Sequence, residues 1–374
     1  MQNVCANSNR SKVSTVSRQP VFPYSVHQQV FKNCAAGSMS TVEFLKNMQA
    51  SIQLLEQQLG FKVIQWISYN FPVIVCRGSV EQNSDGHRQE VCAKFSLCHE
   101  ALRKEAEILF HLEETCSENC HFFPRVLFFT ELQTQAGSCL SSETKMKTER
   151  SGETVFKPSA LFTEWVGTAS VAQIFQQNTR ARVDTGEIEW DIRNLATQLI
   201  FVLLYLRRAR VVSRDIKPSN LLWNRDFRVL YICDFDLGEK QPEWDNFADR
   251  ACPVDFSVAG TPGFIRPQTS VHFEVKNSSE RHETQTTFRE LYKNEVFSSA
   301  VTLASLLAQV PESKVHRFKL HQLMEKAAAN LHIQKRKAFT DLISSMVDYD
   351  GSEAQLKAML CSEFLCHQPS AVQV

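Results

Sequence analysis

The sequence predicts an α+β protein in which a β-rich region precedes a longer, mainly helical one. Residues 61–98 are apolar and rich in β-prone side chains, as successive strands require. Residues 191–208 instead predict a long buried helix, because apolar side chains recur there at helical spacing: Ile192, Leu195, Leu199, Leu203 and Leu206. The 374 residues suffice for two lobes with separate cores, and the balance of 41 basic and 41 acidic residues gives no bias toward nucleic acid or membrane.

The first sixty residues divide into an arm and a helix. Residues 1–40 are rich in Ser, Asn and Gln with little apolar periodicity, so we expect a disordered arm. Residues 41–60 predict a helix that Gly60 ends, because one apolar stripe recurs at spacings of three and four: Leu45, Met48, Ile52, Leu55 and Leu59. The stripe predicts packing on the β-rich region. Its two heptads leave open a short coiled coil, and so a dimer or a regulatory partner bound through helix 41–60.

Composition predicts an intracellular protein, cytoplasmic or nuclear. The first residues lack the apolar core of a secretory signal, and the longest apolar stretch, residues 199–206, is too short to span a bilayer. The twelve cysteines follow no disulfide framework, so we expect reduced thiols. A zinc site is one alternative, drawn from residues within an eleven-residue stretch whose spacing matches no zinc motif: His111, Cys116, Cys120 and His121.

The most informative run is VVSRDIKPSNLLWNRDFRVLYICDFD, residues 211–236. It resembles the catalytic and metal-binding loops of the eukaryotic protein kinase superfamily. The resemblance implies a bilobal protein-kinase-like fold, with a small β-rich N-lobe containing one key helix and a larger, mainly helical C-lobe. It also implies that Asp215 takes the proton of an attacking hydroxyl and that Lys217 neutralises the moving phosphoryl group. Asn220 and Asp234 would hold Mg²⁺ against ATP.

Two triplets in this run depart from the family pattern. Ser213-Arg214-Asp215 stands where His-Arg-Asp is usual, and Asp234-Phe235-Asp236 stands where Asp-Phe-Gly is usual. Because glycine occupies φ > 0 more freely than aspartate, we expect a stiffer metal loop. A rival register takes Asp236-Leu237-Gly238 as the metal triplet. The apolar strand pattern of residues 230–233 ends at Asp234 and favours the first register.

Further N-lobe motifs appear in the family's order. Residues 91–94, Val-Cys-Ala-Lys, resemble the strand whose lysine reaches the ATP phosphates, so the resemblance assigns that role to Lys94 and places Cys92 against adenine. Glu105, eleven residues on in an amphipathic helix, is the expected partner of Lys94, with Glu107 as its rival. Residues 160–167 resemble the strand and hinge that dock adenine, with Thr163 at the gatekeeper position. Further nucleotide contacts are implied for four residues: Val75, Glu164, Val166 and Leu222.

The resemblance also divides the chain. The N-lobe would span residues 61–167 with a polar insert at 133–159, and the C-lobe residues 168–366 with a polar insert at 269–293. Residues 367–374 would form a tail. In the C-lobe, the segment that begins at Glu295 resembles the start of the family's central helix, with glutamate in place of aspartate.

Residues 260–268 resemble the end of the family's activation segment. Thr261 with Lys217 is the serine/threonine-kinase pairing and sets the floor for a substrate hydroxyl. Ser257, four residues earlier, is a candidate phosphorylation site whose phosphate Arg214 could bind. Gln268 replaces a glutamate that forms a buried ion pair in the family, and residues 341–353, where its arginine partner would be expected, contain no arginine.

The nucleotide-covering loop is the weakest match. The family's three glycine positions become Ser68, Asn70 and Val73, and Pro72 lacks a backbone N–H, so we expect a poor clamp on ATP. The sequence as a whole predicts a serine/threonine protein kinase that uses ATP and Mg²⁺ and acts on a protein substrate. A pseudokinase that binds nucleotide or serves as a scaffold is the alternative. A small-molecule kinase is a third hypothesis, which Thr261 disfavours.

Overall fold

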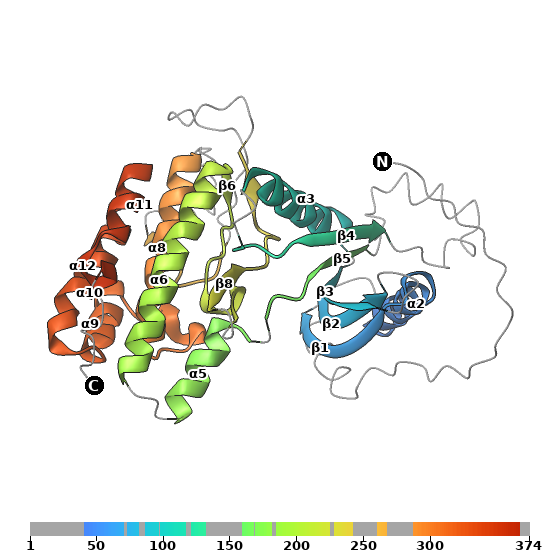
Figure 1. Ribbon diagram of the computed structural model, residues 1–374, viewed down its shortest axis with the longest axis horizontal. Helices are drawn as coiled ribbons and strands as arrows, with labels where there is room; N and C mark the ends of the chain where they lie inside the picture. Colours follow the sequence, from blue (N-terminus) through green and yellow to red (C-terminus); the bar gives the residue numbers. More distant parts are fainter. Residues whose placement is uncertain are drawn as a thin grey trace, which may run out of the picture.

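The computed structural model describes residues 41–70, 73–81, 87–96, 98–116, 121–131, 159–167, 169–181, 185–224, 228–241, 260–267 and 287–366. A β-rich lobe and a helical lobe lie side by side (Figure 1). The predicted α+β, bilobal fold is therefore confirmed. No helix within the described ranges is long and apolar enough to cross a membrane.

The N-lobe is built on a five-stranded antiparallel sheet of order β1-β2-β3-β5-β4. Its strands are β1 (Lys62–Asn70), β2 (Val73–Glu81), β3 (Arg88–Ser96), β4 (Val126–Glu131) and β5 (Ser159–Glu164). Val75 pairs with Lys94, and Cys92 pairs with Thr163. Because directly paired residues share a face, these four side chains lie on one face of the sheet.

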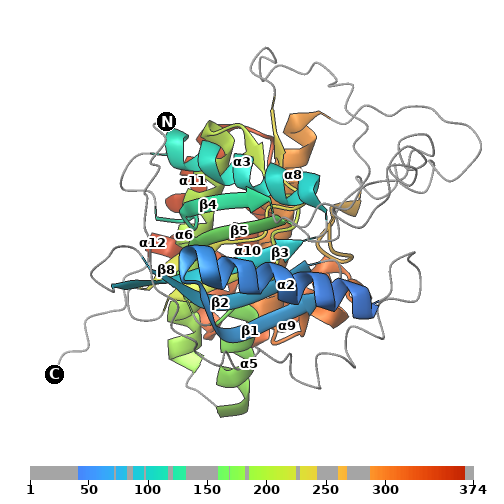
Figure 2. The same ribbon diagram turned by 90° about the vertical axis from the view of Figure 1, so that its right-hand side faces the viewer.

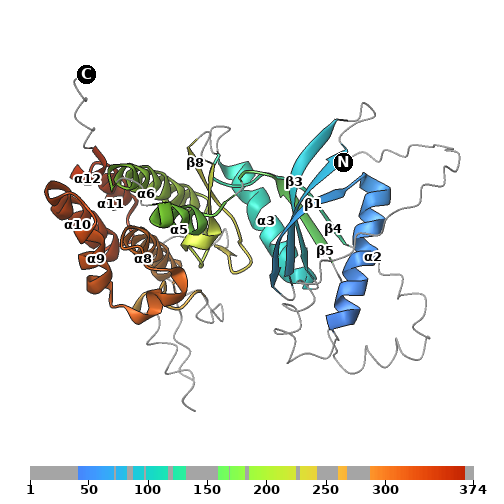
Figure 3. The ribbon, with the colours of Figure 1, turned by 90° about the horizontal axis from the view of Figure 1, so that it is seen from below.

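Two helices cover opposite faces of this sheet, α2 (Thr41–Leu59) and α3 (His99–Thr115) (Figures 2 and 3). Met48, Ile52 and Leu55 of α2 are at most 3% exposed and pack with Phe61, Phe95 and Phe162. The predicted helix with Gly60 at its end is confirmed, since Gly60 has φ +59°. The middle of its apolar stripe is covered by the chain's own sheet, whereas Leu59 is 37% exposed.

The C-lobe is formed by helices around α6 and α8. Its helices are α5 (Val171–Ala181), α6 (Thr185–Arg208), α8 (Phe288–Leu307), α9 (Leu320–Ala329), α10 (Ile333–Val347), α11 (Glu353–Leu360) and α12 (Glu363–Cys366). The predicted buried helix 191–208 is part of α6, where Leu199, Leu203 and Leu206 are fully buried. α8 has nearly every side chain buried, so it serves as the lobe's central support.

Two short two-stranded sheets and two 3₁₀ turns hold the loops between the lobes. β6 (Val211–Val212) pairs with β9 (Glu239–Lys240), and β7 (Leu221–Asn224) pairs with β8 (Val229–Ile232). The 3₁₀ turns are η2 (Pro218–Asn220) and η3 (Glu312–Arg317). Both ends of the loop at residues 213–220 are thus fixed by backbone pairing.

Two predicted insert boundaries differ from the structure. The insert placed at 269–293 ends earlier, because the Thr287 side chain accepts a hydrogen bond from the backbone N–H of Glu290 and starts α8. Phe288 and Tyr292 of that first stretch are buried. The insert placed at 133–159 includes Ser159, which is fully buried and begins β5. In both cases the buried element begins at or beside a polar residue, so the polar composition of the sequence predicted an insert that extends too far.

Candidate active site

Lys94 links the two lobes through two carboxylates. Its Nζ lies 2.7 Å from Oε2 of Glu105 on α3 and 2.6 Å from Oδ1 of Asp234, which follows β8. Glu107, the rival partner, instead pairs with Arg103 on the exposed face of α3. Burial alone would lower the pKa of Lys94, but the two carboxylates outweigh it and hold that pKa above its ordinary value.

Asp215 lies at the centre of a second network. Its Oδ2 accepts hydrogen bonds from Lys217 Nζ at 2.6 Å and Asn220 Nδ2 at 3.1 Å. Its Oδ1 accepts from the Thr261 hydroxyl at 2.7 Å, and that hydroxyl also accepts from Lys217 Nζ at 2.8 Å. The loop at 213–217, η2 and the segment 260–267 are therefore joined at one carboxylate.

The backbone around these groups is held in strained conformations. Arg214 and Asp234 have φ of 67° and 69°, in the left-handed region that non-glycine residues seldom occupy. The expected location of this strain was wrong. We placed the need for φ > 0 at Asp236, but the structure puts it at Asp234, which turns its carboxylate toward Lys94. Aspartate tolerates this region better than most residues.

Glu295 of α8 binds the backbone of the loop that contains the strained residue Arg214. Its carboxylate accepts hydrogen bonds from the backbone N–H groups of Ser213 at 3.2 Å and Arg214 at 2.5 Å. Glu295 is 1% exposed, and burial raises its pKa to about 7, although the two N–H groups favour the ionised form. The glutamate in place of aspartate therefore still reaches the loop.

Glu239 connects α3 to the catalytic loop. Its Oε1 lies 2.5 Å from Nζ of Lys104, the residue before Glu105, and 3.4 Å from Nη1 of Arg214. Pairing of β9 with β6 places Glu239 opposite Val212, just before the catalytic triplet. Sequence reasoning missed Glu239 and Lys104, because their pairing depends on the β6–β9 contact and leaves no spacing signal.

Several predicted features fall on residues outside the described ranges. They include the arm 1–40, the tail 367–374, Pro72, Gln268 and Ser257, the candidate phosphorylation site. Arg214, the group expected to bind a phosphate at Ser257, is 8% exposed and already contacts the carboxylate of Glu239. Ser257 phosphorylation therefore stays a prediction.

The nucleotide-side residues lie where the β-strand register puts them. Cys92 shares the Lys94 face of the sheet with Val75, and burial raises the pKa of the Cys92 thiol to about 11. The carbonyl of Val166 accepts a hydrogen bond from the Asn224 amide at 3.2 Å.

The other two residues expected to contact the nucleotide, Glu164 and Leu222, lie in β5 and β7. Glu164 ends β5, where its carboxylate accepts the Arg125 N–H, and Leu222 lies in β7 and bridges Ser170. The zinc alternative gains no support. His111 bonds the Ala209 carbonyl, Cys120 is outside the described residues, and the described part holds no three metal-ligating side chains together.

Comparison with known proteins agrees with this geometry. Residues 153–365, more than half of the chain, match the model of the protein kinase domain. The serine/threonine-protein kinase par-4 of Caenorhabditis elegans is 29% identical over 201 residues, which cover 53% of this chain and 28% of that protein. The leaf rust 10 disease-resistance locus receptor-like protein kinase-like 1.2 of Arabidopsis thaliana is 26% identical over 137 residues, covering 36% of this chain and 18% of that protein.

Both relatives are much longer than the matched part, since this chain covers less than a third of either one. The family match contains Asp215, Asn220, Asp234 and Thr261, whereas Lys94 and Glu105 precede it. The fold supplies those two groups, because β3 and α3 bring them to Asp234. Because the match to this family model covers more than half of the chain, the chain belongs to the protein kinase family.

Proposed function

We propose that this chain is an ATP-dependent serine/threonine protein kinase that transfers the γ-phosphoryl group of ATP to a protein hydroxyl. The carrying observation is the ion pairing of Lys94 with Glu105 of the N-lobe and Asp234 of the C-lobe. A lone surface ion pair would mean little, but Lys94 and Glu105 are largely buried between the lobes. Ionisable groups that are buried beside a charged partner are typical of functional sites.

The second network suits transfer to an alcohol. Asp215 would accept the proton of the attacking hydroxyl, and Lys217, which contacts Asp215, would offset charge on the transferred group. Thr261 bridges these two residues through one hydroxyl, which favours serine or threonine as the acceptor. Lys94 would hold the α- and β-phosphates, with its own position fixed by Glu105.

The residues present fit a magnesium ion. Asn220 donates its amide N–H groups to Asp215, so its amide oxygen is available as a metal ligand. Asp234 accepts the hydrogen bond of Lys94 through Oδ1, so its Oδ2 is available as a second metal ligand. One carboxylate and one amide oxygen do not complete the coordination of Mg²⁺ by themselves. Magnesium sites of this kind usually take their remaining oxygen ligands from water and from the phosphates of the nucleotide. When bound, Mg²⁺ would neutralise charge on the phosphates.

A second function, a pseudokinase that binds nucleotide or serves as a scaffold, is favoured by the β1–β2 hairpin. No glycine occurs between residue 61 and Gly78. At Gly78 the ring of Phe61 occupies the space in which a side chain would begin. Asn70 and Val73 are paired across the two strands, where the family's glycines would let backbone N–H groups approach phosphate. Weak nucleotide binding is the expected consequence.

Two measurements, of ATP binding and of phosphoryl transfer, distinguish the active kinase from the pseudokinase. Magnesium-dependent ATP binding is measured for the wild type and Asp234→Asn, followed by phosphoryl transfer to a mixture of serine and threonine peptides. We expect Asp234→Asn to weaken binding and Asp215→Asn to reduce the rate by roughly 100- to 10,000-fold without weakening it. Binding without transfer that depends on Asp215 would select the pseudokinase.

A further inference from the structure

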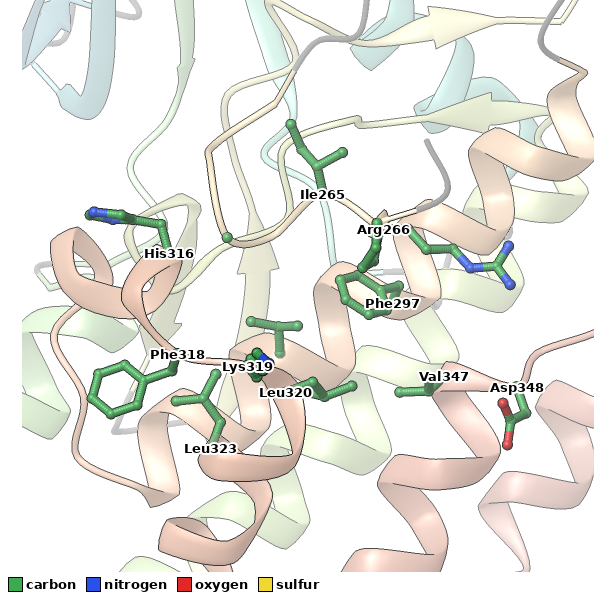
Figure 4. Close-up of a pocket in the computed structure, with 13 residues that line it drawn as sticks. Ile265, Arg266, Phe297, His316, Phe318, Lys319, Leu320, Leu323, Val347 and Asp348 are labelled. Atoms are coloured by element: carbon green, nitrogen blue, oxygen red, sulfur yellow. The ribbon is translucent and has the colours of Figure 1, made fainter. Parts of the chain in front are cut away.

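A cavity of about 440 Å³ lies in the C-lobe, away from the Lys94–Asp234 contact. Its walls come from the segment 263–267, α8, the η3–α9 connection and the end of α10 (Figure 4). Its floor is apolar, with Phe297, Val301 and Leu323 at most 5% exposed. We call this cavity the C-lobe groove.

One wall of the C-lobe groove is continuous with the Thr261 platform. Gly263, two residues after Thr261, has φ +92°, and a Cβ there would lie 2.7 Å from the backbone nitrogen of His316. Ser298 of α8 donates to the Phe264 carbonyl at 2.7 Å, and Asn294 accepts from the Arg266 N–H at 2.8 Å. The groove is therefore held at a fixed distance from the substrate hydroxyl position.

The opposite rim belongs to a cationic stretch, η3 and the start of α9, from which Lys319 and His316 line the cavity itself. Residues 313–324 contain no acidic side chain, and every cationic side chain or histidine among them is exposed: Lys314, His316, Arg317, Lys319 and His321. No ion pair forms at Lys314, Arg317 or Lys319 with any described residue. The nearby Glu312 is engaged, since its carboxylate accepts from the Ser219 N–H and hydroxyl at 3.0 Å each.

The remaining charges of the groove do not cancel this rim. Arg266 is paired with Glu290 at 3.3 Å, so it adds little free charge. Asp348 is the single acidic residue of the lining and lies at the α10 end. An apolar floor with a cationic rim is complementary to a peptide that carries acidic residues around an apolar one.

We infer that the C-lobe groove binds an acidic segment of the protein substrate, with one apolar side chain on the floor and carboxylates at Lys314 and Lys319. The substrate is thereby held at two points, the groove and the Thr261 platform. This inference rests on the proposed kinase function for its consequence in turnover, but the groove's binding of an acidic segment does not require transfer.

The test compares two peptides that share one acceptor serine. The long peptide continues through a flexible linker into Glu-Glu-Leu-Glu, and the short peptide lacks this extension. We expect Lys314→Gln/Lys319→Gln to raise the KM of the long peptide roughly tenfold, since two exposed pairs are removed, and to leave the short peptide unchanged. The matched control, Lys337→Gln/Lys357→Gln, removes two exposed lysines elsewhere in the C-lobe and should change neither KM.

A binding measurement keeps the groove separate from catalysis. The anisotropy of the labelled extension alone should report binding to the full chain that the Lys314/Lys319 variant weakens roughly tenfold, with or without measurable transfer. Replacing the leucine of the extension with serine should also weaken binding. Equal effects of the two double variants would overturn the inference. So would an extension that binds equally well without its leucine, or single-stranded RNA that competes for the same lysines, because either result assigns the rim to polyanions in general.

Discussion

Substitution of Glu239 by glutamine is expected to loosen α3 from the catalytic loop. The change keeps the shape of the side chain and removes the charge that Lys104 and Arg214 share. The Lys104 side chain is 40% exposed, so its pair contributes up to about 1 kcal/mol. The Arg214 side chain is 9% exposed, but its contact is long at 3.4 Å and it has other interactions, so we assign that contact about 1 kcal/mol as well.

The expected loss is therefore about 2 kcal/mol in the free energy of unfolding. Because Lys104 precedes Glu105, loosening this end of α3 should also raise the KM for magnesium-ATP. Urea unfolding and steady-state kinetics measure the two effects. Lys104→Met should lose the α3 share alone, about half of the total.

The matched control is Glu90→Gln. Glu90 forms an ion pair with Arg77 at 2.6 Å that joins β2 to β3 and does not involve α3. Its side chain is 46% exposed, so the loss should stay below about 1 kcal/mol with no change in KM. If Glu239→Gln behaves like Glu90→Gln in both assays, the link between α3 and the catalytic loop has no energetic weight and the reasoning is refuted.

Three further outcomes are expected. Because burial raises the pKa of Glu295 from 4.5 to about 7, its stabilising share is complete below about pH 4.5 and lost as pH rises through about 7. Thermal and urea unfolding should show the wild type losing up to about 3 kcal/mol relative to Glu295→Gln between pH 5 and 8, and a flat difference would contradict this. Thr261→Val should reduce kcat while Thr261→Ser retains most of it, as measured by peptide phosphorylation, because only serine keeps the hydroxyl bridge. Ile52→Ala should lower the free energy of unfolding by about 2–5 kcal/mol without changing the mass measured by light scattering, whereas the exposed Ile67→Ala should stay within about 0.5 kcal/mol; a change of mass would favour the dimer hypothesis.

The helices of this protein whose buried face is marked by an apolar periodicity could be predicted from the sequence. The stripe of α2 and the apolar spacing in α6 indicated buried helices, since periodicity reports which face is covered. The resemblance also predicted that Glu105 is the partner of Lys94, and the two side chains do form an ion pair, whereas the catalytic and metal-binding roles of Asp215 and Asp234 stay predictions.

Features that depend on tertiary pairing could not be predicted in this way. Glu239 reaches Arg214 because β9 pairs with β6, and no spacing records that pairing. The left-handed backbone at Asp234 was assigned to the wrong residue, because the family pattern shows where a glycine is usual and not which φ the loop adopts. The start of α8 was also misplaced, because Phe288 and Tyr292 stand among polar neighbours.

The α2 helix has a practical consequence for producing the N-lobe. Phe61, Phe95 and Phe162 form a ring cluster, with centroids 5.2–6.2 Å apart, on the face that α2 covers. A shortened protein that begins at β1 would present these aromatic rings to water and should self-associate in solution. Fragments intended for crystallisation or screening should therefore begin before Thr41.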